Sequence, residues 1–307
     1  MKSHRSIFFL FLVLPFAQAV AGQTATRSIT IQTEPDAIVW LNGVRYGTTD
    51  KTGRLEIGSA PGGKQTVRVR ANGFSEASKA LPATQKGNVE ILLIRTTDEA
   101  VLAYQEAEKL STVDRSKAAA AYQKAIKLKP SMVEAHIGLA RTLSEAGDFE
   151  GANKAIRQAV RLAPRNAEAA AVDGRIQKLS GDETKSVAAF KKAIANGGGF
   201  QPEAFTGLAV LYQERAEAAA GEGNTALETS NYAESAKYFA TAVKQLGTSL
   251  DAPTVYQLLG LVYEQQKKYK EAIALYEEFL RLFPKSVEAE AVRSFIVQLK
   301  KQMSEQD

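Results

Sequence analysis

The feature that most constrains this chain of 307 residues is a sequence pattern that repeats every 34 residues in its C-terminal two-thirds. Large, small and helix-ending residues recur in the same order in three successive blocks: Tyr122, Ala125 and Pro130; Ile156, Ala159 and Pro164; Phe190, Ala193 and Gly198. A fixed period of this length predicts stacked helix pairs, each burying an apolar face against its neighbour. Because such stacks are usually binding surfaces, recognition is expected before chemistry.

The clearest helix pair carries the pattern Tyr256-x-x-Leu-Gly-x-x-Tyr263, followed by Ala272, Tyr276 and Pro284. The small residues let two helices approach closely, and the proline ends the second helix. This pattern resembles the tetratricopeptide repeat. The resemblance implies an all-α solenoid over residues 98–307 whose groove binds protein partners. At this period the helix pairs fall near 99–130, 133–164, 167–198, 202–247 and 253–284, with a capping helix at 286–302.

The fourth pair departs from the period. Tyr212 and Phe239 are 27 positions apart, whereas the equivalent Tyr263 and Tyr276 are 13 apart. The excess is close to four helical turns, so two extra turns on each helix would preserve the packing. The alternative for residues 213–231 is a flexible loop rich in alanine and glycine.

A different period, of two residues, runs through residues 28–95. Ala37, Val39 and Leu41 alternate with Ile38 and Trp40, which is typical of strands with one buried face. Asn42-Gly43 is a strong hairpin signal, because a type I′ turn needs positive φ at both central positions. The fold class is therefore predicted as α+β multidomain, with a small N-terminal all-β sandwich or barrel before the solenoid.

Part of this β segment resembles a PEGA domain. The resemblance rests on Glu34-Pro-Asp-Ala-Ile-Val-Trp-Leu-Asn-Gly43, Gly47-Thr48, Gly62 and Asn72-Gly-Phe74. Asp36 and Asp50 depart from the family pattern, and the stretch from Asp50 to Ile57 is also similar to carboxypeptidase regulatory-like sandwiches. The resemblance implies an extracytoplasmic module that binds envelope glycans or proteins, and it transfers no catalytic residue.

Residues 1–21 read as a secretory signal peptide. A basic start precedes an apolar run from Ile7 to Phe16, and small residues allow cleavage near Ala19 or Ala21. The protein is therefore expected to be exported, periplasmic or secreted, within a bacterial envelope. No later stretch is long and apolar enough to predict a transmembrane helix.

The composition gives little support for catalysis. The chain has no cysteine, and after cleavage its one histidine is His136, at a packing position of the second pair. Cysteine or histidine nucleophiles and ordinary zinc sites are therefore not expected. We predict a protein that is not an enzyme and has no cofactor, metal or catalytic residue. The net charge is +4 over residues 27–95 and −1 beyond them, which does not predict nucleic-acid binding.

The candidate partner-binding residues lie in both regions. Arg141 and Arg175 occupy the ninth position of successive pairs, with Lys178 nearby, and in tetratricopeptide arrays this position lines the groove. They would suit a carboxylate of a partner, or they are ordinary solvated side chains. The family's asparagine at this position is missing, which argues against its carboxylate-clamp ligands.

Trp40 is expected on the sheet face opposite Val39, where it either stacks on a sugar or partner, or is covered by its neighbours. Arg68 and Arg70 share one strand face, as a basic stripe or as solvated residues. The sequence favours a non-catalytic adaptor, with protein partners in the groove and the sandwich docked to an envelope component. The alternative is a glycan- or peptidoglycan-binding module that assembles through its repeats.

Overall fold

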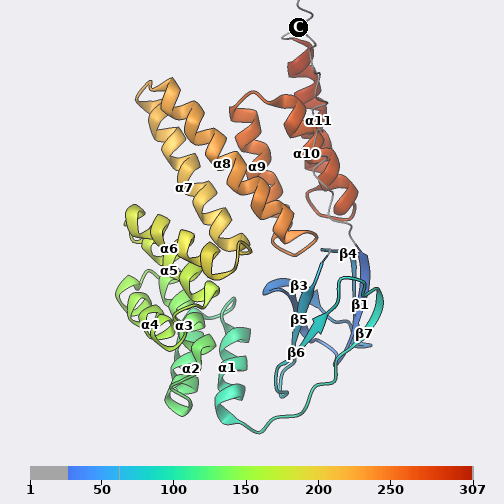
Figure 1. Ribbon diagram of the computed structural model, residues 1–307, viewed down its shortest axis with the longest axis vertical. Helices are drawn as coiled ribbons and strands as arrows, with labels where there is room; N and C mark the ends of the chain where they lie inside the picture. The colour runs from blue at the N-terminus through green and yellow to red at the C-terminus, as the bar shows by residue number, and fades with distance from the viewer. Residues whose placement is uncertain (1–26, 62, 306–307) are drawn as a thin grey trace, which may run out of the picture.

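The computed structural model describes residues 27–61 and 63–305, which form an N-terminal β region and eleven helices in a tetratricopeptide-like arrangement (Figure 1). This confirms the predicted fold class, in which a small β module precedes an all-α solenoid. The expected signal peptide, residues 1–21, lies outside the described residues.

The β region consists of two sheets that share one core. Its strands are β1 (Arg27–Gln32), β2 (Ile38–Leu41), β3 (Val44–Thr48), β4 (Arg54–Ala60), β5 (Gln65–Arg70), β6 (Ala77–Leu81) and β7 (Gly87–Glu90). One sheet has the order β4-β1-β7 and the other β3-β2-β5-β6. All pairings are antiparallel except that of β1 with β7. Val39 and Leu41 are buried in the core, as their alternation predicts.

The turn between β2 and β3 follows from two residues. Asn42 and Gly43 have φ values of +49° and +84°, and they join antiparallel strands. Positive φ at both central positions is the type I′ geometry that matches the twist of a hairpin. The predicted hairpin is therefore confirmed.

The helices are α1 (Glu99–Leu110), α2 (Arg115–Leu128), α3 (Val133–Glu145), α4 (Phe149–Leu162), α5 (Ala167–Leu179), α6 (Glu183–Asn196), α7 (Pro202–Gly221), α8 (Thr225–Leu246), α9 (Ala252–Gln265), α10 (Tyr269–Leu282) and α11 (Ala289–Ser304). Consecutive helices pack in pairs, and α11 covers the last pair. Asp114, Asp148 and Asp182, spaced by 34 residues, accept backbone hydrogen bonds at the starts of α2, α4 and α6. The period therefore places N-caps as well as core residues.

Both helices of the long fourth pair are continuous, and residues 222–224 form the turn between them. α7 has 20 residues and α8 has 22, whereas the other paired helices have 12 to 14. The two helices stay together, and the buried Ser235 hydroxyl donates to the carbonyl of Ala209 at 2.8 Å. Of the two alternatives for residues 213–231, extra turns on each helix are therefore what the structure shows.

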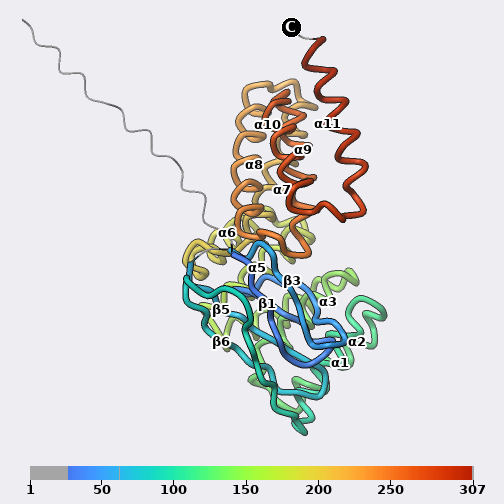
Figure 2. The backbone as a smooth tube through the Cα atoms, turned by 90° about the vertical axis from the view of Figure 1, so that its right-hand side faces the viewer, coloured from blue at the N-terminus to red at the C-terminus, as the bar shows by residue number. Residues whose placement is uncertain are grey.

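The β region lies beside the inner side of the solenoid (Figures 1 and 2). The inner layer consists of the first helices of the pairs, because α3 contacts α1 and α5, and α5 contacts α7. The linker after β7 leads directly into α1. The β region therefore lies beside the helices that follow it in the chain. This placement decides what the groove can hold.

Candidate functional site

A cavity of about 1660 Å³ lies between the four-stranded sheet and the inner layer of the solenoid. Strands β2, β3 and β5 line one side, and α1, α3, α5, α7 and α9 line the other. Ordinary small-ligand pockets have volumes of about 300–1,000 Å³. The larger cavity therefore has room for an extended segment of polypeptide.

The sheet is tied to α1 at one end of this cavity. Arg70 is buried, and its guanidinium lies 4.8 Å from the centre of the Tyr104 ring and 3.4 Å from the Glu108 carboxylate. The Gln105 side chain donates to the carbonyl of Phe74 at 2.7 Å and accepts from the amide of Gly73 at 2.9 Å. The stacking of Arg70 on Tyr104 and the two hydrogen bonds of the Gln105 amide thus hold the β region against α1.

The sheet meets the solenoid again after α8. The Tyr46 hydroxyl donates to the carbonyl of Leu246 at 3.1 Å, and the amide of Leu250 donates to the carbonyl of Arg45 at 3.3 Å. Burial raises the pKa of the Tyr46 phenol above its usual range, so the hydroxyl stays a donor. The β region therefore contacts the solenoid at two places, and the cavity lies between them.

Trp40 lies on the sheet face opposite the core and lines the cavity. The residue is only 8% exposed, because the guanidinium groups of Arg68 and Arg70 lie 4.5 and 4.7 Å from the centre of its ring. The covered alternative for Trp40 is thus what the structure shows. Arg68 also lies 3.7 Å from the Glu76 carboxylate, so the expected basic stripe is partly neutralised.

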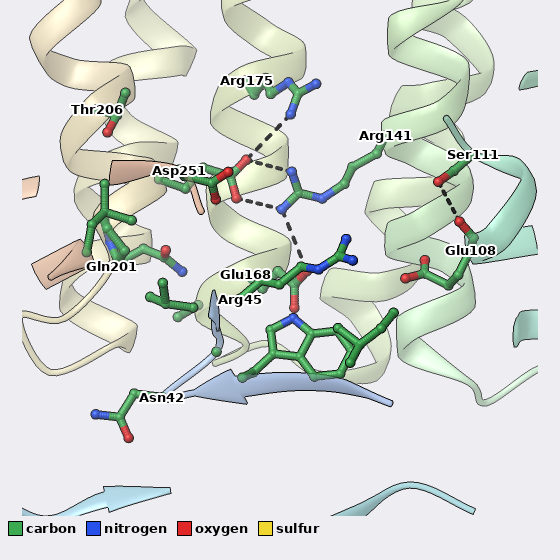
Figure 3. Close-up of a pocket in the computed structure, with 18 of the residues that line it drawn as sticks. Asn42, Arg45, Glu108, Ser111, Arg141, Glu168, Arg175, Gln201, Thr206 and Asp251 are labelled. Atoms are coloured by element: carbon green, nitrogen blue, oxygen red, sulfur yellow. Dashed lines mark hydrogen bonds and ion pairs between the residues drawn. The ribbon is translucent and has the colours of Figure 1, made fainter. Parts of the chain in front are cut away.

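A chain of charged side chains runs along the helical wall of the cavity (Figure 3). Arg141 donates two hydrogen bonds to the Glu203 carboxylate, at 2.8 and 2.5 Å, and lies 3.6 Å from Glu168. Arg175 bonds Glu145 and lies 3.9 Å from Glu203. Hydrogen bonds between a guanidinium group and a carboxylate are strong and directional when the two planes are paired. The chain therefore holds α3, α5 and α7 in register.

This arrangement changes the expectation for the two arginines. The structure brings Arg141 and Arg175 to one wall, but carboxylates of the same chain already bind both. Lys178 is likewise paired, with Glu214 at 2.7 Å. These cations are therefore not free sites awaiting a partner's carboxylate, because a ligand must first displace the internal partners. Reversing both arginines to glutamate would also disturb the wall itself.

Glu203 is the central carboxylate of the wall. Burial alone would raise the pKa of its carboxyl, but the charge and hydrogen bonds of Arg141, with Arg175 further away, outweigh burial and lower the pKa. A carboxyl whose pKa is lowered on folding stabilises the folded state above its unfolded pKa. That contribution is lost as the pH falls through the folded pKa.

Glu203→Gln should therefore lower the free energy of unfolding at pH 7 by about 1–2 kcal/mol, since both partners are partly solvated. The difference from wild type should shrink as the pH falls from about 5 toward 3, where the wild-type carboxyl becomes protonated. Urea unfolding at a series of pH values measures this. Glu214→Gln, which breaks the more exposed pair with Lys178, should cost less than about 1 kcal/mol. A difference for Glu203→Gln that stays constant down to about pH 3 would contradict the assignment.

Glu203, Tyr46 and Gln105 are functional residues that the sequence patterns above do not single out. A signal for Glu203 was present, because Glu168 and Glu203 hold the second position of their pairs, across from the ninth-position arginines. No local pattern marks Tyr46 or Gln105, which act through contacts between the β region and the solenoid.

His136 is buried, and its Nε2 lies 3.0 Å from the carbonyl of Pro130. It is thus a packed residue that contacts the end of the first pair, and burial is what its repeat position predicts. Across residues 27–61 and 63–305, no group of three or more His, Cys, Asp or Glu side chains is arranged to hold a metal ion.

Comparison with known proteins supports the repeats. Residues 114–176 and 220–287 match two models of the tetratricopeptide repeat, and neither stretch includes the β region. The crystal structure of yeast Tom70 aligns over 68% of this chain with a TM-score of 0.54 and 19% identity. The chain spans 41% of that structure. The PEGA resemblance of the β region remains a prediction.

Two further solved structures align with a similar share of this chain. A thermophilic tetratricopeptide protein of Thermus thermophilus aligns over 64% of this chain and 99% of its own, with a TM-score of 0.46 and 17% identity. The MamA protein aligns over 64% and 96%, with a TM-score of 0.42 and 20% identity. No curated protein sequence matches this chain.

Proposed function

We propose that this protein is a non-catalytic, exported adaptor that holds an extended segment of a partner protein in the cavity between its sheet and its helical groove. Tetratricopeptide repeats are typical of protein-interaction scaffolds, and they account for the helical wall. The export half of the proposal rests on the signal-peptide pattern of residues 1–21.

The cavity between the sheet and the helices is the observation that carries the proposal. Its helical side offers Thr206 and Gln201, and its sheet side offers the exposed Arg45 (Figure 3). These groups can bond the backbone of an extended chain, whose peptide groups need donors and acceptors on both sides. The β region thus forms half of the binding surface, instead of a separate module beside an open groove.

The β region would also contact an envelope component through surface outside the cavity. After β7, Leu92 and Ile94 are 80% and 77% exposed, while Leu93 between them packs against the core. Exposed aliphatic side chains on an ordered segment are a suitable docking surface. The glycan alternative has less support, because it relied on a free Trp40 ring.

A photo-crosslinking amino acid in place of Thr206 tests the proposal in cells that secrete the protein. We expect a crosslinked partner from this position, and none from Thr184, which is exposed near the start of α6. The captured species should be the same when the crosslinker replaces the exposed Arg45 on the opposite wall. Equal capture at Thr184, or none at Thr206 and Arg45, would place partner binding outside the cavity. Fractionation of the same cells tests export independently.

A further inference from the structure

The second helices of the first three pairs form a basic outer layer. α2, α4 and α6 together contain ten Lys/Arg and two Asp/Glu. The corresponding helices of the last two pairs, α8 and α10, contain four Lys/Arg and five Asp/Glu. α2 and α4 lie on the side of the solenoid away from the sheets (Figure 1). The positive charge is therefore concentrated on one half of the outer layer.

Most of these cations have no carboxylate partner. Arg115, Lys117 and Lys185 form ion pairs near the starts of their helices. The others are exposed and form no ion pair within the described part of the chain: Lys124, Lys127, Lys154, Arg157, Arg161, Lys191 and Lys192. A solvated outer face usually mixes both signs of charge, so seven unpaired cations point to an external anion.

The repeat places these cations on one face. Lys127 and Arg161 are 34 residues apart, as are Arg157 and Lys191, so each couple occupies equivalent places in successive pairs. Within α4, Lys154, Arg157 and Arg161 have the i, i+3, i+7 spacing of one helical face.

Exposed leucines lie among these cations. Leu128 ends α2 directly after Lys127 and is 46% exposed. Leu162 ends α4 directly after Arg161 and is 39% exposed. Being 34 residues apart, the two leucines hold equivalent positions. Aliphatic side chains between cations are typical of surfaces that lie at a membrane interface, with the chains among the lipids and the cations at the phosphates.

We propose that this basic outer face, formed by the seven unpaired cations with Leu128 and Leu162, binds the surface of a bilayer that contains anionic phospholipids. Binding would be peripheral, because no helix in the described ranges is long and apolar enough to cross a membrane. Single-stranded nucleic acid fits less well, since it is held by stacking on exposed aromatic rings. The aromatic residues Tyr122 of α2 and Phe190 of α6 are buried, and Phe149 at the start of α4 is partly buried.

Sedimentation with vesicles tests this inference. The chain is used without residues 1–21, because the apolar run from Ile7 to Phe16 would itself enter lipid. We expect binding at low salt to vesicles of phosphatidylcholine with one-third phosphatidylglycerol, and none to phosphatidylcholine alone. Salt should weaken the binding. Lys127→Glu with Arg161→Glu should weaken it by about 25-fold or more, at about five-fold per cation.

Two further variants separate the contributions of charge and of the leucines. Lys244→Glu with Lys270→Glu makes the same charge change on exposed cations of α8 and α10, and it should reduce binding far less. Leu128→Ser with Leu162→Ser should weaken binding without changing the charge. Circular dichroism checks that each variant is folded.

Three outcomes would overturn the proposal. Absence of binding to anionic vesicles is the first, and equal loss in the α8 and α10 control is the second. The third is binding to a soluble polyanion or an acidic protein without binding to vesicles, which would assign the face to a different partner.

Discussion

Replacing Phe190 with alanine should lower the free energy of unfolding by about 3–5 kcal/mol, the largest effect we expect from a single substitution. The residue is 1% exposed, and its ring fills a slot between two glycines of the neighbouring helices α5 and α7. A Cβ atom on Gly174 would lie 2.6 Å from the ring, and one on Gly207 would lie 2.3 Å from it. Gly174 and Gly207 have no side chain that could fill the space left by the ring, so the substitution should leave a void inside the helix pairs.

Chemical unfolding followed by circular dichroism measures this cost. Phe295→Ala is the matched control, because Phe295 is 42% exposed and its loss should cost about 1 kcal/mol or less. Phe190→Leu should fall between the two, since leucine restores part of the buried volume. If Phe190→Ala costs no more than Phe295→Ala, the third and fourth pairs do not pack through this ring.

The helices could be predicted from the sequence because their determinants are local and repeated. Asp114, Asp148 and Asp182 cap helices at the 34-residue period, and each is followed by apolar residues at helical spacing. The hairpin at Asn42 was predictable for the same reason, since two adjacent residues specify the turn.

The cavity between the sheet and the helices could not be predicted in this way. It depends on contacts between residues far apart in the chain, such as the hydrogen bond from Tyr46 to Leu246. A tyrosine on a strand and a carbonyl at a helix end leave no pattern in the sequence that links them. The repeat predicted an inner wall, and the position of the β region against that wall emerged only from the structure.

The charged wall lies between these two cases. The ninth position predicted that Arg141 and Arg175 would share one wall, and the structure places them there. To predict that carboxylates neutralise them, a second pattern was needed, namely the glutamates at the second position of the next pairs. The stacking that brings Glu203 across to Arg141 was needed as well. One repeat position is therefore not enough to assign a ligand site, because the other residues on the same wall decide whether its side chain is free.

A second tightly packed contact lies at the glycine in the eighth position of the fifth pair. Gly260 is buried in α9, and a Cβ atom there would lie 2.2 Å from the Tyr276 hydroxyl and 2.4 Å from the ring carbon that bears it. Tyr276 is 2% exposed, and its hydroxyl donates to Glu264 at 2.9 Å. The ring cannot move aside without breaking this bond or displacing core neighbours.

Gly260→Leu should therefore lower the free energy of unfolding by about 2–3 kcal/mol through overpacking. Leucine is a better helix former than glycine, but that gain is less than about 1 kcal/mol and offsets only part of the cost. Gly221→Leu is the matched control, because Gly221 is exposed at the end of α7 and a Cβ atom there meets open space. We expect the control to change stability by no more than about 0.5 kcal/mol. Thermal and urea unfolding of both variants measure the difference. An unchanged midpoint for Gly260→Leu would mean that α9 and α10 do not meet at this glycine, and that the repeat register of the fifth pair is wrong.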